Sequence, residues 1–213
     1  MTRTSPRRGY GATQLCWATP LYGFLKECEA VGLPKEVLDC GAGGNRPPLA
    51  LFHDFGYETA GLEFDPEALD KAREYCLQRD IELNIRLGDM RDIPFDDASF
   101  SFVYSFNAIF FLTKSDARVS VSEMRRVLRP GGLCYVNFMS VDDPDDGCFA
   151  ESSHTRTVLN NERFSKHADD EADAYFEGFT LVRKEKRIID TPGGDGLPRH
   201  AYVDYAVRKN ATG

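Results

Sequence analysis

The sequence lacks the features by which small proteins hold a metal ion or a disulfide framework. Its six cysteines are widely spaced, form no C-x-x-C pair and have no histidine tract beside them. This arrangement favours reduced thiols in an intracellular protein over a metal site. We therefore expect no metal and a cytoplasmic location. Cys40 closes a short apolar run and is expected to be a small buried side chain, not a nucleophile.

Long apolar runs are absent as well. No stretch reaches the roughly 20 consecutive apolar residues that a membrane-spanning helix needs. The early part of the chain is interrupted by Gly11, Gln14 and Pro20, which argues against a signal peptide. We expect no membrane partner.

Positive charge is in the minority. The 26 Lys and Arg residues face 34 Asp and Glu residues, which gives a formal net charge of -8. A chain with this balance repels phosphate backbones, so nucleic acid is a poor candidate partner.

What is present is the composition of an ordinary globular domain. The chain has 213 residues, of which 42% are hydrophobic and 28% are charged. At this length folding removes roughly 70% of the unfolded surface from water, so a single domain with a large core is expected.

From residue 36 onward, apolar runs of strand length alternate with helical patterns. Such alternation predicts an α/β fold, doubly wound around a mainly parallel sheet. Two further runs, joined by a Pro- and Gly-rich segment, predict an antiparallel C-terminal hairpin and bring the sheet to seven strands. The strands are predicted at 36–40, 58–64, 83–89, 99–106, 133–139, 180–190 and 200–209, and the helices at 49–55, 66–78 and 115–128.

Four segments divide this single domain. Residues 1–34 are predicted to be an N-terminal helical segment, 35–139 the core, 140–178 an acidic cap and 179–213 the hairpin. Residues 140–178 hold 11 acidic and 3 basic residues, so the acidity of the chain is local. A connection of this length is usually a functional lid or disordered. We expect its second half, from about Asn161, to be helical.

The strongest motif is VLDCGAGGN at residues 37–45. A strand that ends in Asp39 leads into a turn where Gly41 and Gly43 let the backbone approach a ligand closely. A dinucleotide fingerprint would need a third glycine where this chain has Arg46, and no P-loop motif is present.

At this point the sequence resembles the S-adenosylmethionine-dependent methyltransferases with a Rossmann-like fold. LDCGAGG is similar to their first motif, and AGLEFDPEALDKARE to their second. GDMRDIPFDDASFSFVYS resembles the third and fourth motifs, and EMRRVLRPGGLCYV the segment before strand five. The resemblance covers residues 35–139 and implies S-adenosyl-L-methionine as the cofactor.

The chemistry of that cofactor suits these residues, because it carries an ammonium, a sulfonium and a ribose diol but no pyrophosphate. Glu63 lies 22 residues beyond Gly41, a spacing at which an acid can accept from both ribose hydroxyls. Phe64 would flank the adenine, and Asp89 would accept from its amino group. Met90 offers an apolar contact to the ring, and the backbone around Ser105 should face the methionine moiety.

Several of these residues also have purely structural interpretations. Asp39 can cap its turn by accepting from nearby N–H groups. Asp65 precedes Pro66 and is expected to be a helix cap more than a ligand. Met90 fits the core as well as it fits a cofactor contact.

No catalytic residue is assigned, because methyl transfer depends mainly on positioning and on the exclusion of water. His154, His167 and Tyr175 are candidate bases, each of which is more often an ordinary residue.

Acidic and aromatic residues outside the motifs offer further candidates. The acidic run Asp142, Asp143, Asp145 and Asp146 follows strand five and is expected to be a solvated loop, with selection of a cationic amine or of a divalent metal as the functional alternative. Tyr10, Trp17 and Tyr22 are candidates to fold over the cofactor.

The expected function is methyl transfer from S-adenosylmethionine to a small-molecule acceptor. A protein or RNA methyltransferase is one alternative, although an acidic cap suits a basic peptide better than RNA. A protein that binds S-adenosylmethionine without turnover is the other. A nicotinamide-dependent reductase is disfavoured by Arg46, and the oligomeric state is not indicated.

Overall fold

Strands and helices alternate along the chain as predicted. The computed structural model describes residues 12–143, 164–189 and 200–211, and only the backbone of residues 12–19. The helices are α1 (Ala12–Val31), α2 (Leu49–Asp54), α3 (Pro66–Arg79) and α4 (Lys114–Val127), with short 3-10 helices η1 (Ile109–Phe111) and η2 (Glu171–Tyr175). The strands are β1 (Glu36–Cys40), β2 (Glu58–Glu63), β3 (Ile85–Leu87), β4 (Phe100–Ser105), β5 (Leu128–Ser140), β6 (Lys166–His167), β7 (Phe179–Ile189) and β8 (His200–Lys209).

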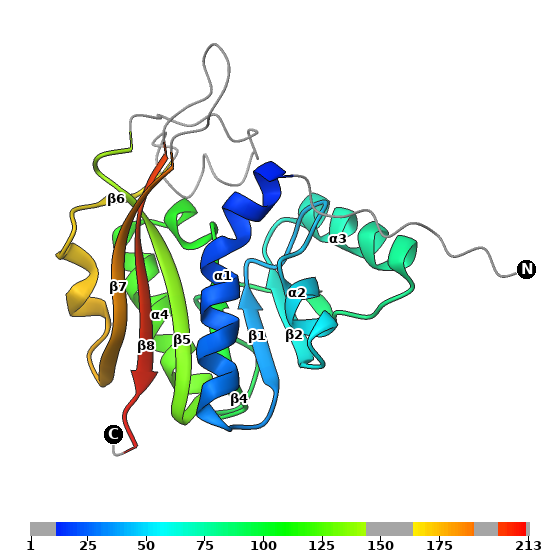
Figure 1. Cartoon of the computed structure of the whole chain (residues 1–213), viewed down its shortest axis with the longest axis horizontal. Coiled ribbons are helices and arrows are strands. Elements are labelled where there is room, and N and C mark those ends of the chain that lie inside the picture. The colour runs from blue at the N-terminus through cyan, green and yellow to red at the C-terminus, as the bar shows by residue number, and fades with distance from the viewer. Residues whose placement is uncertain (1–11, 144–163, 190–199, 212–213) are drawn as a thin grey trace, which may run out of the picture.

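One sheet runs through the molecule in the order β3-β2-β1-β4-β5-β8-β7, and the short β6 pairs with β5 beside this path (Figure 1). The strands β1 to β5 are parallel to one another, whereas β8 is antiparallel to both β5 and β7. The predicted α/β fold and its antiparallel C-terminal hairpin are therefore confirmed.

The helices begin where local chemistry permits. Asp65 caps α3 by accepting from the Glu67 N–H at 2.9 Å, and Pro66 occupies the first turn, where its missing N–H leaves no bond unmade. The structural interpretation of Asp65 is thus confirmed. Thr113 caps α4 in the same way by accepting from the Asp116 N–H at 3.1 Å.

Two apolar layers hold the sheet between the helices. The layer under α1 and α2 is rich in aromatic rings, and Phe24 of α1 packs against Tyr104 and Tyr135 with ring centroids 6.3 and 5.6 Å away. The opposite layer lies under α4 and η2, and its centre includes Val121 and Phe138. In Figure 1, α1 lies across one face of the sheet and α4 across the other.

Polar contacts fix α1 at both flanks of the sheet. Tyr57, just before β2, donates its hydroxyl to Glu29 at 2.9 Å. On the far side, the Arg183 Nε of β7 donates to Glu27 at 2.8 Å. The helix therefore bridges the two halves of the sheet.

The helix predicted from about Asn161 is not formed in the described part of that segment. Residues 164–178 contain only β6 and the short η2. The acidic side chains here pair across to β7, since Lys184 contacts Asp170 at 2.7 Å and Asp173 at 2.6 Å. Charge pairing with β7 favours this docked arrangement over a regular helix.

None of the helices in the described residues has the length and apolar character needed to span a membrane.

Candidate functional site

A pocket of about 310 Å³ opens at the carboxyl ends of β1, β2 and β4, where a doubly wound sheet binds its ligands. Six of the eight residues predicted from the sequence line it. They are Gly41, Gly43, Glu63, Phe64, Asp89 and Met90.

Two glycines in the turn after β1 stand where there is no room for a side chain. Gly41 has φ +119°, and a Cβ there would collide with the Cβ of Ala108. A Cβ on Gly43 would collide with the Glu63 carboxylate and with Ala68. The turn thus presents bare backbone to the pocket, which is what close approach by a ligand requires.

Glu63 is held by two backbone donors. Its Oε2 accepts from the Gly43 N–H at 2.7 Å and its Oε1 from the Asp65 N–H at 2.9 Å. Burial raises the pKa of Glu63, and these two bonds oppose the rise only in part. Each carboxylate oxygen keeps a second acceptor site, so the oriented side chain can still receive a pair of hydroxyl groups.

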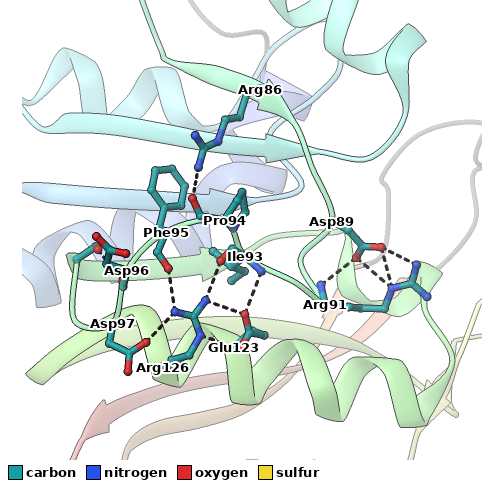
Figure 2. A network of polar contacts seen from close by, with 11 residues as sticks. Arg86, Asp89, Arg91, Ile93, Pro94, Phe95, Asp96, Asp97, Glu123 and Arg126 are labelled. Atoms are coloured by element: carbon teal, nitrogen blue, oxygen red, sulfur yellow. Dashed lines mark hydrogen bonds and ion pairs between the residues drawn. The ribbon is translucent and has the colours of Figure 1, made fainter.

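The adenine side predicted for the pocket contains an unforeseen cation. Arg91 donates from Nη2 and Nε to Asp89 at 2.6 and 2.9 Å (Figure 2). It also contacts Asp116 at 3.3 Å. Burial acts to raise the pKa of Asp89, but the bonds and charge of Arg91 outweigh it and the pKa is lowered. The Arg91 guanidinium also lies 6.0 Å from the ring of Phe64, which is 46% exposed.

The loop that follows Asp89 is fastened to α4. Figure 2 shows Arg126 donating to the carbonyls of Ile93 and Phe95 at 2.7 and 2.8 Å while it pairs with Glu123. The Ile93 N–H in turn donates to Glu123 at 3.0 Å. This network fixes the loop that carries the acidic wall of the pocket.

The turn after β4 is fixed by a pair of amides that sequence reasoning missed. Asn107 lines the pocket with φ +55°, a conformation that Asn tolerates better than most residues. Its N–H donates to Asn137 Oδ1 at 2.7 Å, and Asn137 Nδ2 donates back to Asn107 Oδ1 at 2.7 Å. A signal was present, because Asn137 interrupts the apolar run of β5.

Asp39 and Ser105 lie outside the pocket lining. Asp39 is 1% exposed, and no backbone N–H of a described residue donates to its carboxylate. Burial raises its pKa well above the ordinary value, the charge of Glu63 adds to the rise, and the Tyr104 hydroxyl opposes it. Ser105 is fully buried at the end of β4. Met90 lines the pocket and also packs against the core, so both of its interpretations hold.

The candidate bases lie elsewhere. His167 is fully buried, and its Nε2 lies 3.2 Å from the Tyr175 hydroxyl. Burial lowers the pKa of His167 to about 4. His154 falls outside the described residues, as do the side chain of Trp17 and all of Tyr10; Tyr22 is partly exposed on α1.

The first two residues of the acidic run have side-chain partners. Asp142 pairs with Lys186, and Asp143 Oδ2 lies 3.2 Å from His200 Nδ1. Asp145 and Asp146 are outside the described residues. In the described part of the chain, no group of three or more His, Cys, Asp or Glu side chains is arranged to hold a metal ion.

These features fit an adenosyl cofactor. The pocket offers a bare glycine turn, a fixed carboxylate, an exposed aromatic face and a second carboxylate. Its cation Arg91 already pairs with two carboxylates, so it is not set to receive a pyrophosphate.

Comparisons with known proteins agree with this geometry. The sequence profile of the family described as "Methyltransferase domain" matches residues 38–136. The chain is 27% identical over 191 residues to the sterol 24-C-methyltransferase of Pneumocystis carinii, covering 82% of this chain and 47% of that protein. It is 33% identical over 100 residues to the demethylmenaquinone methyltransferase of Deinococcus radiodurans, covering 46% of this chain and 41% of the relative. The chain spans less than half the length of these curated relatives.

Solved structures share the fold at low sequence identity. The PH0226 protein of Pyrococcus horikoshii superposes with a TM-score of 0.67 at 20% identity, covering 93% of this chain and 90% of that one. The 1,6-didemethyltoxoflavin-N1-methyltransferase of Burkholderia thailandensis, solved with S-adenosylhomocysteine, superposes with a TM-score of 0.61 at 18% identity. The superposition covers 93% of this chain and 79% of that one. Residues 38–136 therefore belong to the methyltransferase domain family, and the chain has the Rossmann-like fold of the class I, S-adenosylmethionine-dependent methyltransferases.

Proposed function

We propose that this chain transfers a methyl group from S-adenosylmethionine to a small-molecule acceptor. The observation that carries the proposal is the joint geometry of Glu63 and the glycine turn, where a backbone-oriented carboxylate faces a surface without side chains. The relatives support the choice of acceptor class, since their names describe methylation of a sterol and of demethylmenaquinone.

Each pocket residue then has a defined task. Glu63 accepts from the ribose hydroxyls, Phe64 covers one face of the adenine, and Asp89 faces its amino group. The turn at Asn107, locked by Asn137, holds the backbone beside the methionine moiety. When bound, the cofactor supplies an electrophilic methyl group. The protein holds donor and acceptor in line and excludes water.

The acceptor site would lie at the carboxyl ends of the strands, between the N-terminal helix and the segment 140–178. A cytoplasmic location is part of the proposal, supported by the free thiols of Cys28, Cys40, Cys76 and Cys134.

Calorimetric titration with S-adenosylmethionine, S-adenosylhomocysteine and NADH tests the cofactor. Both adenosyl ligands should bind and NADH should not. Glu63→Ala should weaken adenosyl binding by roughly tenfold or more, because two charge-assisted hydrogen bonds are lost. Glu67→Ala is the matched control, since that carboxylate is exposed on α3 and does not line the pocket. Failure of both adenosyl ligands to bind would contradict the proposal.

Two alternatives are separated by turnover. Cofactor binding without release of S-adenosylhomocysteine across a panel of phenols, quinols and amines would favour a protein that binds but does not transfer. Turnover with a basic peptide alone would favour a protein methyltransferase.

A further inference from the structure

A second row of polar side chains lies beside the cofactor pocket, on the face of the sheet that α1 covers. Asn137 of β5 stands opposite Asp204 of β8 in the strand register. Directly opposed side chains point to the same face with Cβ atoms about 5 Å apart. Because Asn137 also holds Asn107 of the pocket wall, Asp204 is one strand away from the methionine end of the proposed cofactor site.

Asp204 belongs to a buried ion pair. Arg187 of β7 donates to Asp204 from Nε at 2.8 Å and from Nη2 at 3.3 Å. The Asp204 side chain is 0% exposed and the Arg187 side chain is 17% exposed. The Arg187 guanidinium also lies 4.7 Å from the ring of Tyr202. The pair carries no net charge, and each partner fixes the orientation of the other.

One buried donor in this row is left over. Arg187 Nη1 is buried and makes no hydrogen bond within the described residues. The Tyr135 hydroxyl is turned toward Asp204 instead: burial raises the pKa of Tyr135, and the charge of Asp204 and a hydrogen bond to it add to the rise. An unmet buried guanidinium donor destabilises the fold, so Arg187 Nη1 calls for an explanation.

We propose that Asp204, Arg187 and Tyr135 form the acceptor site, and that it takes an uncharged molecule bearing a hydroxyl group, such as a phenol. This inference rests on the proposed methyltransferase function. A hydroxyl donates to Asp204 and accepts from Arg187 Nη1, so one group satisfies both sides of the site, while Tyr135 helps to orient Asp204. Charged acceptors are disfavoured at this pair. An ammonium group would be repelled by the Arg187 guanidinium, and a carboxylate would be repelled by Asp204.

The test compares three aromatic probes of similar size on protein saturated with S-adenosylhomocysteine. We expect 2-naphthol to bind more tightly than 2-naphthoate or 2-naphthylmethylamine. Arg187→Gln and Asp204→Asn should weaken 2-naphthol binding by roughly tenfold, and Tyr135→Phe by a smaller factor, since it removes one hydroxyl and no charge. The affinity for S-adenosylhomocysteine reports that each variant is folded and should stay within about twofold.

Lys186→Gln is the matched control, because Lys186 lies on the same strand and pairs with Asp142 and Asp169 instead. It should leave both affinities unchanged. A preference for either charged probe, unchanged 2-naphthol binding in the Arg187 and Tyr135 variants, or binding of none of the probes would overturn the assignment. A wild-type protein that does not bind S-adenosylhomocysteine would overturn the proposed function and the acceptor site with it.

Discussion

At the residue scale, one added carbon atom should be enough to close the cofactor turn. Gly43→Ala places a Cβ against the Glu63 carboxylate, and the group that must yield is the proposed ribose ligand. We expect the affinity for S-adenosylhomocysteine to fall by roughly tenfold or more, with the loss of at least one charge-assisted bond. Calorimetric titration measures it.

The control for that substitution is Gly23→Ala. Gly23 lies inside α1, and among the described side chains its added Cβ would meet only Arg183, at 3.8 Å. Alanine is favoured over glycine within a helix by about 0.5–1 kcal/mol, so this variant should be slightly more stable and bind normally. Equal binding by the two variants would contradict the steric account of the turn.

His167 provides a pH-dependent prediction. Burial, with help from the charge of Lys114, lowers its pKa to about 4, against the opposing effect of Glu171. Its folded pKa lies below the unfolded value, so its contribution to stability is complete above pH 6.5 and is lost as the pH falls toward 4. The NMR titration of its ring protons should show a midpoint near 4, and His167→Gln should lose less stability between pH 6.5 and 4. A midpoint near 6.5 would show that the imidazole is solvated.

At the scale of elements, the contact between α4 and the acidic loop depends on one arginine. Arg126→Ala removes the donors to the carbonyls of Ile93 and Phe95 and leaves Glu123 without its cation. We expect a loss of about 1–3 kcal/mol in the free energy of unfolding. Amide exchange at Ile93 should become faster, which hydrogen exchange measures.

An exposed ion pair on the preceding helix, α3, is the control for Arg126. Arg73 pairs with Asp70 at 3.0 Å on the surface of α3, and Arg73→Ala should change stability by no more than about 0.5 kcal/mol. Comparable losses in both variants would mean that the carbonyl contacts of Arg126 contribute little.

The elements themselves could be predicted because their boundaries are marked locally. The buried run of β1 ends at Gly41, and Asp65 and Pro66 mark the start of α3. The segment after Asn161 misled the sequence reasoning, because its acidic residues are satisfied by Lys184 of β7, a partner that no local pattern reveals.

Some residues of the candidate site could likewise be predicted from the sequence, and others could not. The glycines and Glu63 follow from the end of a strand and a short spacing along the chain. Asn107 follows β4 and Asn137 lies in β5, 30 residues further along the chain. Only the tertiary structure therefore brings these two side chains together. The contact between Asp204 and Arg187 requires in addition that β8 lies between β5 and β7 in the sheet.

At the scale of the whole molecule, Asp39 should make stability depend on pH. Its pKa is raised in the folded state, so its contribution is complete below the ordinary value of 3.8 and is lost as the pH rises toward the folded pKa. Asp39→Asn removes this loss. The variant should therefore gain stability relative to the wild type as the pH rises from 3.8 toward the folded pKa of Asp39. Urea unfolding without cofactor measures the gain, and a difference that is constant across this pH range would contradict the buried carboxyl.

The bridge that α1 makes across the sheet also has a consequence for synthesis on the ribosome. Glu27 bonds to Arg183, 156 residues further along the chain, and the apolar layer beneath the helix includes Ala206 of β8. At ordinary translation rates roughly 8 to 30 s pass before that partner strand emerges. During this interval the apolar face of α1 has no completed surface to cover, so the first described helix of the nascent chain is among the last to dock.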